Sequence, residues 1–86
     1  TNLNELYLNN NQINKIKLGG FKGLINLKLL DLSNNKLNSI SFDDFSDLNS
    51  LEVLNLCDNQ IQTIEYNTFE KLNNLKRLDL SQNKIN

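Results

Sequence analysis

Leucines and isoleucines recur along the chain in a fixed order that neither a single helix nor a simple strand would produce. In the stretch LKLLDLSNNKLNSI (residues 27–40), leucines stand at intervals of three, two and five residues, and an asparagine precedes the last of them. Shifting the sequence so that Leu3 falls on Leu27 aligns the chain with itself, with no insertion between copies. The unit is LxxLxLxxNxIxxIxxxxFxxL, and a period of this length indicates a repeat protein.

The repeated positions form columns in which one residue type returns once in every unit. Four copies share three leucines, an asparagine and a further aliphatic residue, and three copies share another isoleucine, a phenylalanine and a leucine. The columns are Leu3, Leu27, Leu51 and Leu75; Leu6, Leu30, Leu54 and Leu78; Leu8, Leu32, Leu56 and Leu80; Asn11, Asn35, Asn59 and Asn83; Ile13, Leu37, Ile61 and Ile85; Ile16, Ile40 and Ile64; Phe21, Phe45 and Phe69; and Leu24, Leu48 and Leu72.

Each unit begins with a short alternating stretch, such as 30–32, which predicts a strand with Leu30 and Leu32 on one face and Asp31 on the other. The apolar residues that follow fit a coil that turns back and sends its side chains to one interior. A single coil cannot enclose these side chains, whereas stacked coils cover one another. Burial of about 1.5–3 kcal/mol per large apolar side chain only partly offsets the ordering entropy of one coil, so several adjacent coils are needed.

The asparagine column, Asn11, Asn35, Asn59 and Asn83, falls just after each strand, where the chain must bend. A carboxamide carries both a donor and an acceptor. We expect these side chains to stack and to satisfy backbone groups that the bend removes from the strand ladder. The alternative is that asparagine is simply common in this chain, but neighbouring asparagines such as Asn10 and Asn34 do not recur in all four copies.

The segments LYLNNNQINKI, LDLSNNKLNSI, LNLCDNQIQTI and LDLSQNKI resemble the leucine-rich repeat signature L-x-x-L-x-L-x-x-N/C-x-L. The 24-residue length and the recurring phenylalanine are similar to the typical, mostly extracellular subclass of Toll-like receptors, insect Toll receptors, adhesion proteins and secreted immune proteins. The resemblance implies an α/β solenoid wound as a right-handed superhelix. A parallel β-sheet would form the concave face, and irregular or 3-10 coil the convex face.

The resemblance extends over essentially the whole chain, which we interpret as one leucine-rich-repeat segment, 1–86. Its repeats are expected at about 3–26, 27–50 and 51–74, with a partial repeat at 75–86. Cysteine-rich caps, usual in extracellular members, are missing, and the first and last copies look like internal ones. The segment is therefore expected to be part of a larger solenoid.

The composition of the chain limits the kinds of partner and the kinds of chemical site that we expect. A net charge of −1 does not suggest a nucleic-acid or acidic-membrane partner, and no apolar run is long enough to span a bilayer. The opening TNLNELYL has no basic start or apolar block, so no signal peptide is expected. With no histidine and no metal-ligand spacing, we expect no enzyme activity, no cofactor and no metal site. Cys57 takes the position of Ser33 and Ser81 and is interpreted as an inert replacement, with an exposed thiol or a bond to another chain as alternatives.

Residues free to vary between the fixed leucines are expected to line the concave face. Leu29 and Val53 are apolar there and should be adjacent, with Tyr7 beside them and charged residues around them. An apolar centre with a polar rim is typical of a protein-binding patch, although two aliphatic residues also simply suit a strand. The candidate binding residues are Tyr7, Leu29, Asp31, Val53, Asn55, Arg77 and Asp79.

These features predict a protein-binding scaffold without chemistry of its own. By resemblance, it would belong to the extracellular or cell-surface ectodomain of a receptor, or to a secreted protein, in innate immunity. Its partner would be a protein ligand or co-receptor, with a homo- or heterodimer possible, no nucleic acid and no direct membrane contact. The alternatives are a set of architectural spacer repeats of an adhesion protein and a cytoplasmic adaptor or regulatory subunit.

Overall fold

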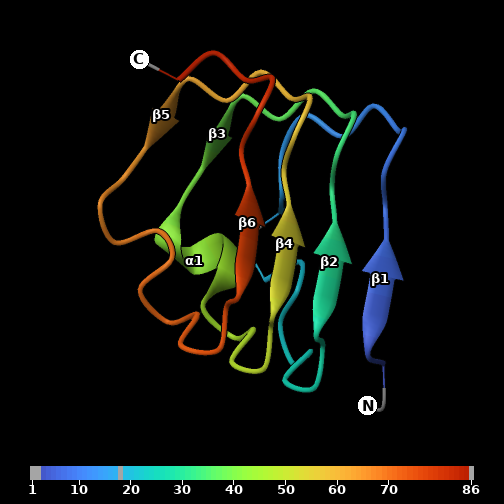
Figure 1. Cartoon of the computed structure of the whole chain (residues 1–86), viewed down its shortest axis with the longest axis vertical. Coiled ribbons are helices and arrows are strands. Elements are labelled where there is room, and N and C mark those ends of the chain that lie inside the picture. The colour runs from blue at the N-terminus through green and yellow to red at the C-terminus, as the bar shows by residue number, and fades with distance from the viewer. Residues whose placement is uncertain (1–2, 18, 86) are drawn as a thin grey trace.

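The chain winds into stacked coils, each of which contributes one short strand to a common sheet (Figure 1). The computed structural model describes residues 3–17 and 19–85; the outer bounds of the predicted segment, 1–2 and 86, lie outside the described residues, as does position 18. The four-stranded sheet has the order β1-β2-β4-β6 and consists of β1 (Glu5–Tyr7), β2 (Leu29–Asp31), β4 (Val53–Asn55) and β6 (Arg77–Asp79).

All strand pairs in this sheet are parallel and keep one register. Leu30 pairs with Leu6 on one side and with Leu54 on the other, and Leu54 pairs in turn with Leu78. Every partner therefore stands one repeat unit away along the chain, so that the period of the sequence is the period of the sheet. The predicted solenoid with a parallel sheet is confirmed.

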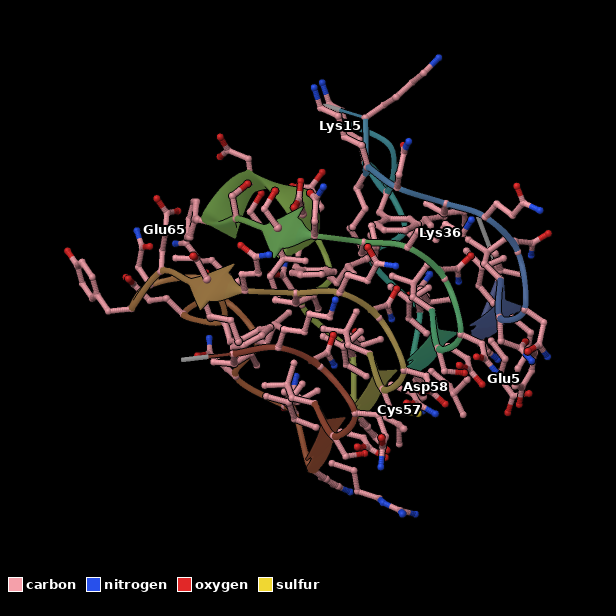
Figure 2. All side chains as sticks on the ribbon, turned by 90° about the horizontal axis from the view of Figure 1, so that it is seen from above. Glu5, Lys15, Lys36, Cys57, Asp58 and Glu65 are labelled. Atoms are coloured by element: carbon pink, nitrogen blue, oxygen red, sulfur yellow. The ribbon has the colours of Figure 1, made fainter. Side chains whose placement is uncertain are left out.

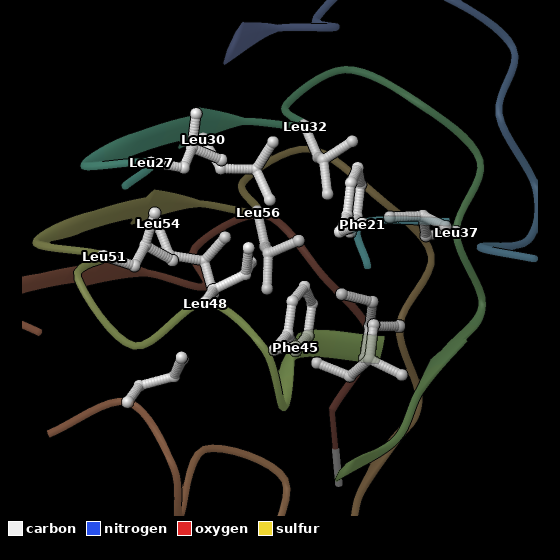
Figure 3. Packing of buried hydrophobic residues seen from close by; sticks show 13 residues of the cluster. Phe21, Leu27, Leu30, Leu32, Leu37, Phe45, Leu48, Leu51, Leu54 and Leu56 are labelled. Atoms are coloured by element: carbon white, nitrogen blue, oxygen red, sulfur yellow. The ribbon is translucent and has the colours of Figure 1, made fainter. Parts of the chain in front are cut away.

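The interior holds the inward-pointing leucines of the two middle coils and the phenylalanines behind them (Figure 3). The rings of Phe45 and Phe69 stack with centroids 6.0 Å apart and an interplanar angle of 26°. Nine aliphatic residues of the middle coils have no exposed surface: Leu27, Leu30, Leu32, Leu37, Leu48, Leu51, Leu54, Leu56 and Ile61. The apolar side chains of a coil are thus fully shielded from water only when another coil covers that coil on each side.

The side of the coils opposite the sheet varies from copy to copy. The second coil forms one helical turn, α1 (Phe42–Phe45), which begins after Ser41. The backbone N–H of Ser41 donates to Oδ2 of Asp44 at 2.9 Å, a contact that satisfies a group at the start of a helix. The other two coils have no Ser-x-x-Asp sequence at this point and form turns instead. Two strands that the sequence pattern did not predict, β3 (Ser39–Ile40) and β5 (Thr63–Ile64), pair beside this turn.

Equivalent leucines should differ in their contribution to stability according to how many coils cover them. Leu54 is fully buried between two coils, whereas its register partner Leu78 is 39% exposed. We expect Leu54→Ala to lower the free energy of unfolding by about 2–5 kcal/mol and Leu78→Ala by less than about 2 kcal/mol. Urea unfolding followed by circular dichroism measures both values, and equal losses would contradict the one-sided covering of Leu78.

Candidate functional site

The outward side chains of the four-stranded sheet form a continuous surface, named here the sheet face. Parallel pairing places them in two rows that run across the strands. In the first row are Glu5, Leu29, Val53 and Arg77, and in the second row are Tyr7, Asp31, Asn55 and Asp79. Seen from above, Glu5 and Cys57 lie on the strand side of the coils, whereas Lys15 and Glu65 lie on other sides (Figure 2).

The structure brings all seven candidate binding residues together on the sheet face. Leu29 and Val53 are direct register partners in the middle of the first row, and both are half-buried. Tyr7 is 57% exposed, and Arg77 is exposed on the outer strand. Beside Arg77, the Nζ of Lys76 lies 3.8 Å from Oε1 of Glu52, an exposed ion pair that contributes little to stability.

Residues of the second row also form hydrogen bonds with the backbone at the ends of their strands. Oδ1 of Asp31 accepts the backbone N–H of Ser33 at 3.0 Å and its hydroxyl at 2.7 Å. Asp79 makes the same two contacts with Ser81, at 3.0 and 2.6 Å. These hydrogen bonds from Ser81 hold the pKa of the Asp79 carboxyl below its usual value, since they favour the ionised form. Asp79 therefore keeps a negative charge on the sheet face at neutral pH.

Asn55 and Cys57 make the corresponding contact in the third coil. Oδ1 of Asn55 accepts the backbone N–H of Cys57 at 3.1 Å. Burial raises the pKa of the Cys57 thiol, and the carboxylates of Asp79, Asp58 and Asp31 raise it further. A thiol with a raised pKa is a poor nucleophile at neutral pH, which favours the interpretation of Cys57 as a replacement for serine.

Tyr7 presents its ring at the N-terminal edge of the sheet face. Its hydroxyl donates to Oε1 of Glu5 at 3.2 Å. This hydrogen bond raises the pKa of Tyr7, because ionisation would lose the contact and place two negative charges together. The ring therefore stays neutral and offers an amphipathic surface of the kind enriched at protein interfaces.

Each residue of the asparagine column that has a coil before it joins two coils. Oδ1 of Asn35 accepts the N–H of Ile13 at 3.1 Å, and its Nδ2 donates to the carbonyl of Leu8 at 3.0 Å. The same Nδ2 donates within its own coil to Leu32 at 2.9 Å and Ser33 at 3.1 Å. Matching contacts to the preceding coil and within the bend belong to Asn59 and Asn83.

Asn11 has only the local half of this pattern, because the described residues include no coil before it. Its Nδ2 donates to the carbonyls of Leu8 at 3.0 Å and Asn9 at 3.2 Å. Asn35 is 7% exposed, whereas Asn11 is exposed. The two positions therefore provide a natural comparison of the same side chain with and without a preceding coil.

Sequence reasoning missed the backbone conformation of the residue before the asparagine column. It treated this position as one more variable residue of the concave face. In all four coils the residue has a positive φ: Asn10 at 61°, and Asn34, Asp58 and Gln82 at 57°. Asn and Asp tolerate the left-handed region better than other residues with a side chain, so their presence in three of four copies was a readable signal.

Across residues 3–17 and 19–85, no group of three or more His, Cys, Asp or Glu side chains could hold a metal ion. Within the same ranges, no helix has the length and apolar character needed to cross a membrane.

Comparison with known proteins identifies the class. The sequence profile of the leucine rich repeat family matches residues 1–56 and 49–86, which together span the chain. The chain belongs to the leucine-rich repeat family. Among solved structures, it is similar to internalin C2 from Listeria monocytogenes, with 34% sequence identity and a TM-score of 0.80.

The match to internalin C2 covers 99% of this chain and 35% of that chain, so this chain spans about a third of its length. No curated protein sequence matches the chain. Neither the family profile nor the solved structure supports the finer assignment to the extracellular subclass of Toll-like receptors and insect immune proteins.

Removing one carboxamide should test the link between coils. Asn35→Ala removes all four contacts and leaves the N–H of Ile13 without its acceptor, while the carbonyl of Leu8 keeps only the contact from Asn11. We therefore expect it to lower the free energy of unfolding by about 1–3 kcal/mol. The control Asn11→Ala removes only local contacts and should cost less than about 1 kcal/mol. Urea unfolding compares the two, and similar losses would refute the linking role.

A substitution at the positive-φ position of the fourth coil should increase the stability of the protein. Gln82 has a φ of 57°, where asparagine is better tolerated. Gln82→Asn should therefore raise the free energy of unfolding by about 0.5–1 kcal/mol. Gln60→Asn makes the same chemical change at an exposed position outside the positive-φ set and should give no gain in thermal unfolding. If both variants gained stability, the cause would be the change from glutamine to asparagine itself and not the backbone conformation at position 82.

Proposed function

We propose that the chain is a protein-binding scaffold that engages its partner through the sheet face and performs no chemistry of its own. The observation that carries the proposal is the pairing of Leu29 with Val53 in the middle of the first row. Two half-buried aliphatic side chains stand there side by side on the outward side of a sheet, between Glu5 and Arg77. Leucine-rich repeat domains generally mediate protein–protein interaction, which agrees with this use.

The sheet face has the anatomy of a small interface. Apolar side chains at its centre can exclude water, while the charged and polar ends of both rows can orient a partner. Tyr7 adds an exposed aromatic ring beside the aliphatic pair, on the strand next to β2. Because strand pairing holds the backbone of these residues in place, binding would not have to order that backbone, which lowers its entropic cost.

The scaffold is proposed to be a section of a longer solenoid, supported by the likeness to about a third of the length of internalin C2. A protein ligand or co-receptor remains the predicted partner. The extracellular or cell-surface location and the role in innate immunity remain predictions from the family resemblance alone. They are separate from the proposal for the sheet face, which depends only on the residues of this chain.

An architectural spacer is the second candidate function, and one observation favours it. The second row uses Oδ1 of Asp31, Asn55 and Asp79 for hydrogen bonds that close the strand ends. These residues therefore have a structural reason to be polar that does not involve a partner. Under this alternative, Leu29 and Val53 are present because aliphatic residues suit a strand.

Crosslinking from two tyrosine positions distinguishes the scaffold from the spacer. A photo-crosslinking amino acid would replace Tyr7 on the sheet face or, as the control, Tyr66, which is fully exposed after β5. The protein is expressed in its native cells, and crosslinked proteins are identified by mass spectrometry. We expect a partner that is captured from position 7 and not from position 66.

The captured partner is then titrated against the double variant Leu29→Lys, Val53→Lys. Loss of two apolar contacts at an interface centre should weaken binding by at least about 10-fold, with circular dichroism showing that the fold is kept. Capture from position 66 alone, or unchanged affinity in a folded double variant, would reject the sheet-face proposal in favour of the spacer.

A further inference from the structure

Negative charge gathers along one side of the sheet face, where the strands end. Four short segments close the strands: 7–10, 31–34, 55–58 and 79–82. We name these segments the strand-end strip. The strip carries Asp31, Asp58 and Asp79 and no lysine or arginine, whereas the segments where the strands begin carry both signs of charge. The sheet face is therefore polarised along the direction of its strands.

The three carboxylates of the strip lie close to one another. Asp31 and Asp79 stand in the second row on either side of Asn55. Asp58 follows Cys57, and the two lie together on the strand side of the coils (Figure 2). Besides burial, all three carboxylates raise the pKa of the Cys57 thiol, although the field of an exposed charge is screened within about 10 Å. The strip is thus one anionic surface.

The fold does not require these charges. Asp31 and Asp79 each use Oδ1 to accept the N–H two residues further along, and Asn55 makes the same contact with a neutral side chain. Asp58 has a φ of 57°, the value that Asn34 has at the equivalent position. An amide therefore serves at all three kinds of position, while neighbouring carboxylates repel one another. The acidic character of the strip has no structural cause in these contacts.

The strip is also placed to share a partner with the aliphatic pair. In residues 3–17 and 19–85, the hydrogen bonds of the Asp31 and Asp79 side chains all go to Oδ1, which leaves Oδ2 as an acceptor for a partner. Leu29 stands two positions before Asp31 on β2 and beside Val53 on β4, and both strands are paired on each side. Side chains two positions apart on a strand project from one face about 7 Å apart. A partner that covers the aliphatic pair therefore also meets the strip.

Charge complementarity determines what kind of surface fits there. An aliphatic side chain can exclude water from Leu29 and Val53, and a cation beside it can donate to the free carboxylate oxygens. The apolar stem of a lysine or arginine can continue the contact from the aliphatic pair to the strip. An acidic side chain in the same place would meet repulsion.

We propose that the partner of the sheet face is a protein segment that presents lysine or arginine beside an aliphatic side chain. The aliphatic group covers Leu29 and Val53, and the cation lies on the strand-end strip. This proposal rests on the function proposed above and adds the chemistry of the partner. Exposed ion pairs contribute little affinity, but they orient a partner and exclude wrongly charged ones, so the cationic side of the segment faces the strand ends.

Three fluorescein-labelled peptides of equal length serve as probes and are titrated with the whole chain. They repeat Gly-Leu-Lys, Gly-Leu-Glu or Gly-Ser-Lys. We expect the Gly-Leu-Lys peptide to bind at least about 10-fold more tightly than either of the others, because it alone supplies both aliphatic groups and cations. Its affinity should fall as the salt concentration rises, since salt screens exposed charges.

An amide substitution tests the charges of the second row. The double variant Asp31→Asn, Asp79→Asn removes two charges and keeps acceptor oxygens like that of Asn55. The preference for the Gly-Leu-Lys over the Gly-Leu-Glu peptide should fall to less than about 3-fold. The matched control Asp43→Asn, Glu65→Gln removes the same charge from exposed positions on α1 and after β5, and it should keep the full preference.

Adding a charge provides the converse test. Asn55→Asp places a carboxylate between Asp31 and Asp79 and keeps an oxygen for the N–H of Cys57. It should strengthen binding of the Gly-Leu-Lys peptide about 2- to 3-fold and lower the melting temperature, because like charges then stand directly across the strands. Circular dichroism establishes that each variant is folded.

The outcomes separate this proposal from the one on which it rests. If the Gly-Leu-Lys and Gly-Leu-Glu peptides bind equally, and both lose affinity in the double variant Leu29→Ser, Val53→Ser, the sheet face binds a partner but the chemistry proposed here is wrong. A preference that survives Asp31→Asn, Asp79→Asn, or that the matched control loses equally, would also overturn it. Failure of all three peptides to bind would overturn it too, and the crosslinking from position 7 then decides the function of the sheet face.

Discussion

The carboxamide of the asparagine column is the interaction on which the stack depends. At the end of each strand the backbone must turn, which leaves carbonyl groups without strand partners in a region that leucines keep dry. Asn35 satisfies two carbonyls of its own bend and also reaches a donor and an acceptor of the preceding coil. One side chain thus closes the turn and fixes the distance to the neighbouring coil, and no apolar residue could do both.

Once the bend is fixed, the register of the parallel strands determines where the inner and outer side chains lie. The inner leucines pair with their equivalents at a constant offset, which gathers them into one buried cluster that runs through the coils. The same offset places Leu29 beside Val53 on the outer side. The same strand register therefore determines both the core and the candidate binding surface. A change of register would destroy both together.

The sequence predicted the features that identical residues repeat, and it missed a helical turn found in one coil and a backbone conformation that different residues adopt in all four. The sheet, its register and the buried leucines were readable because four copies carry the same letters at one spacing. The helical turn α1 depends on Ser41 and Asp44, which only the second coil has, so no periodicity could reveal it. The positive φ at Asn34 and Asp58 was overlooked because a varying letter was equated with a free surface position, although the backbone restricts it. The binding role of Leu29 and Val53 remains a prediction, since geometry places side chains without naming a partner.

The constant offset between paired strands has a consequence for how such a chain can change in length. Duplicating or deleting one whole unit leaves every carboxamide, leucine and strand edge facing its equivalent, so the remaining contacts are unaltered. Gaining a single residue within a strand would instead turn its inward leucines toward water. Growth of this architecture within its strands is therefore restricted to whole units. The loops opposite the sheet can differ in length and shape, provided that they keep the phenylalanine and leucine that complete the core.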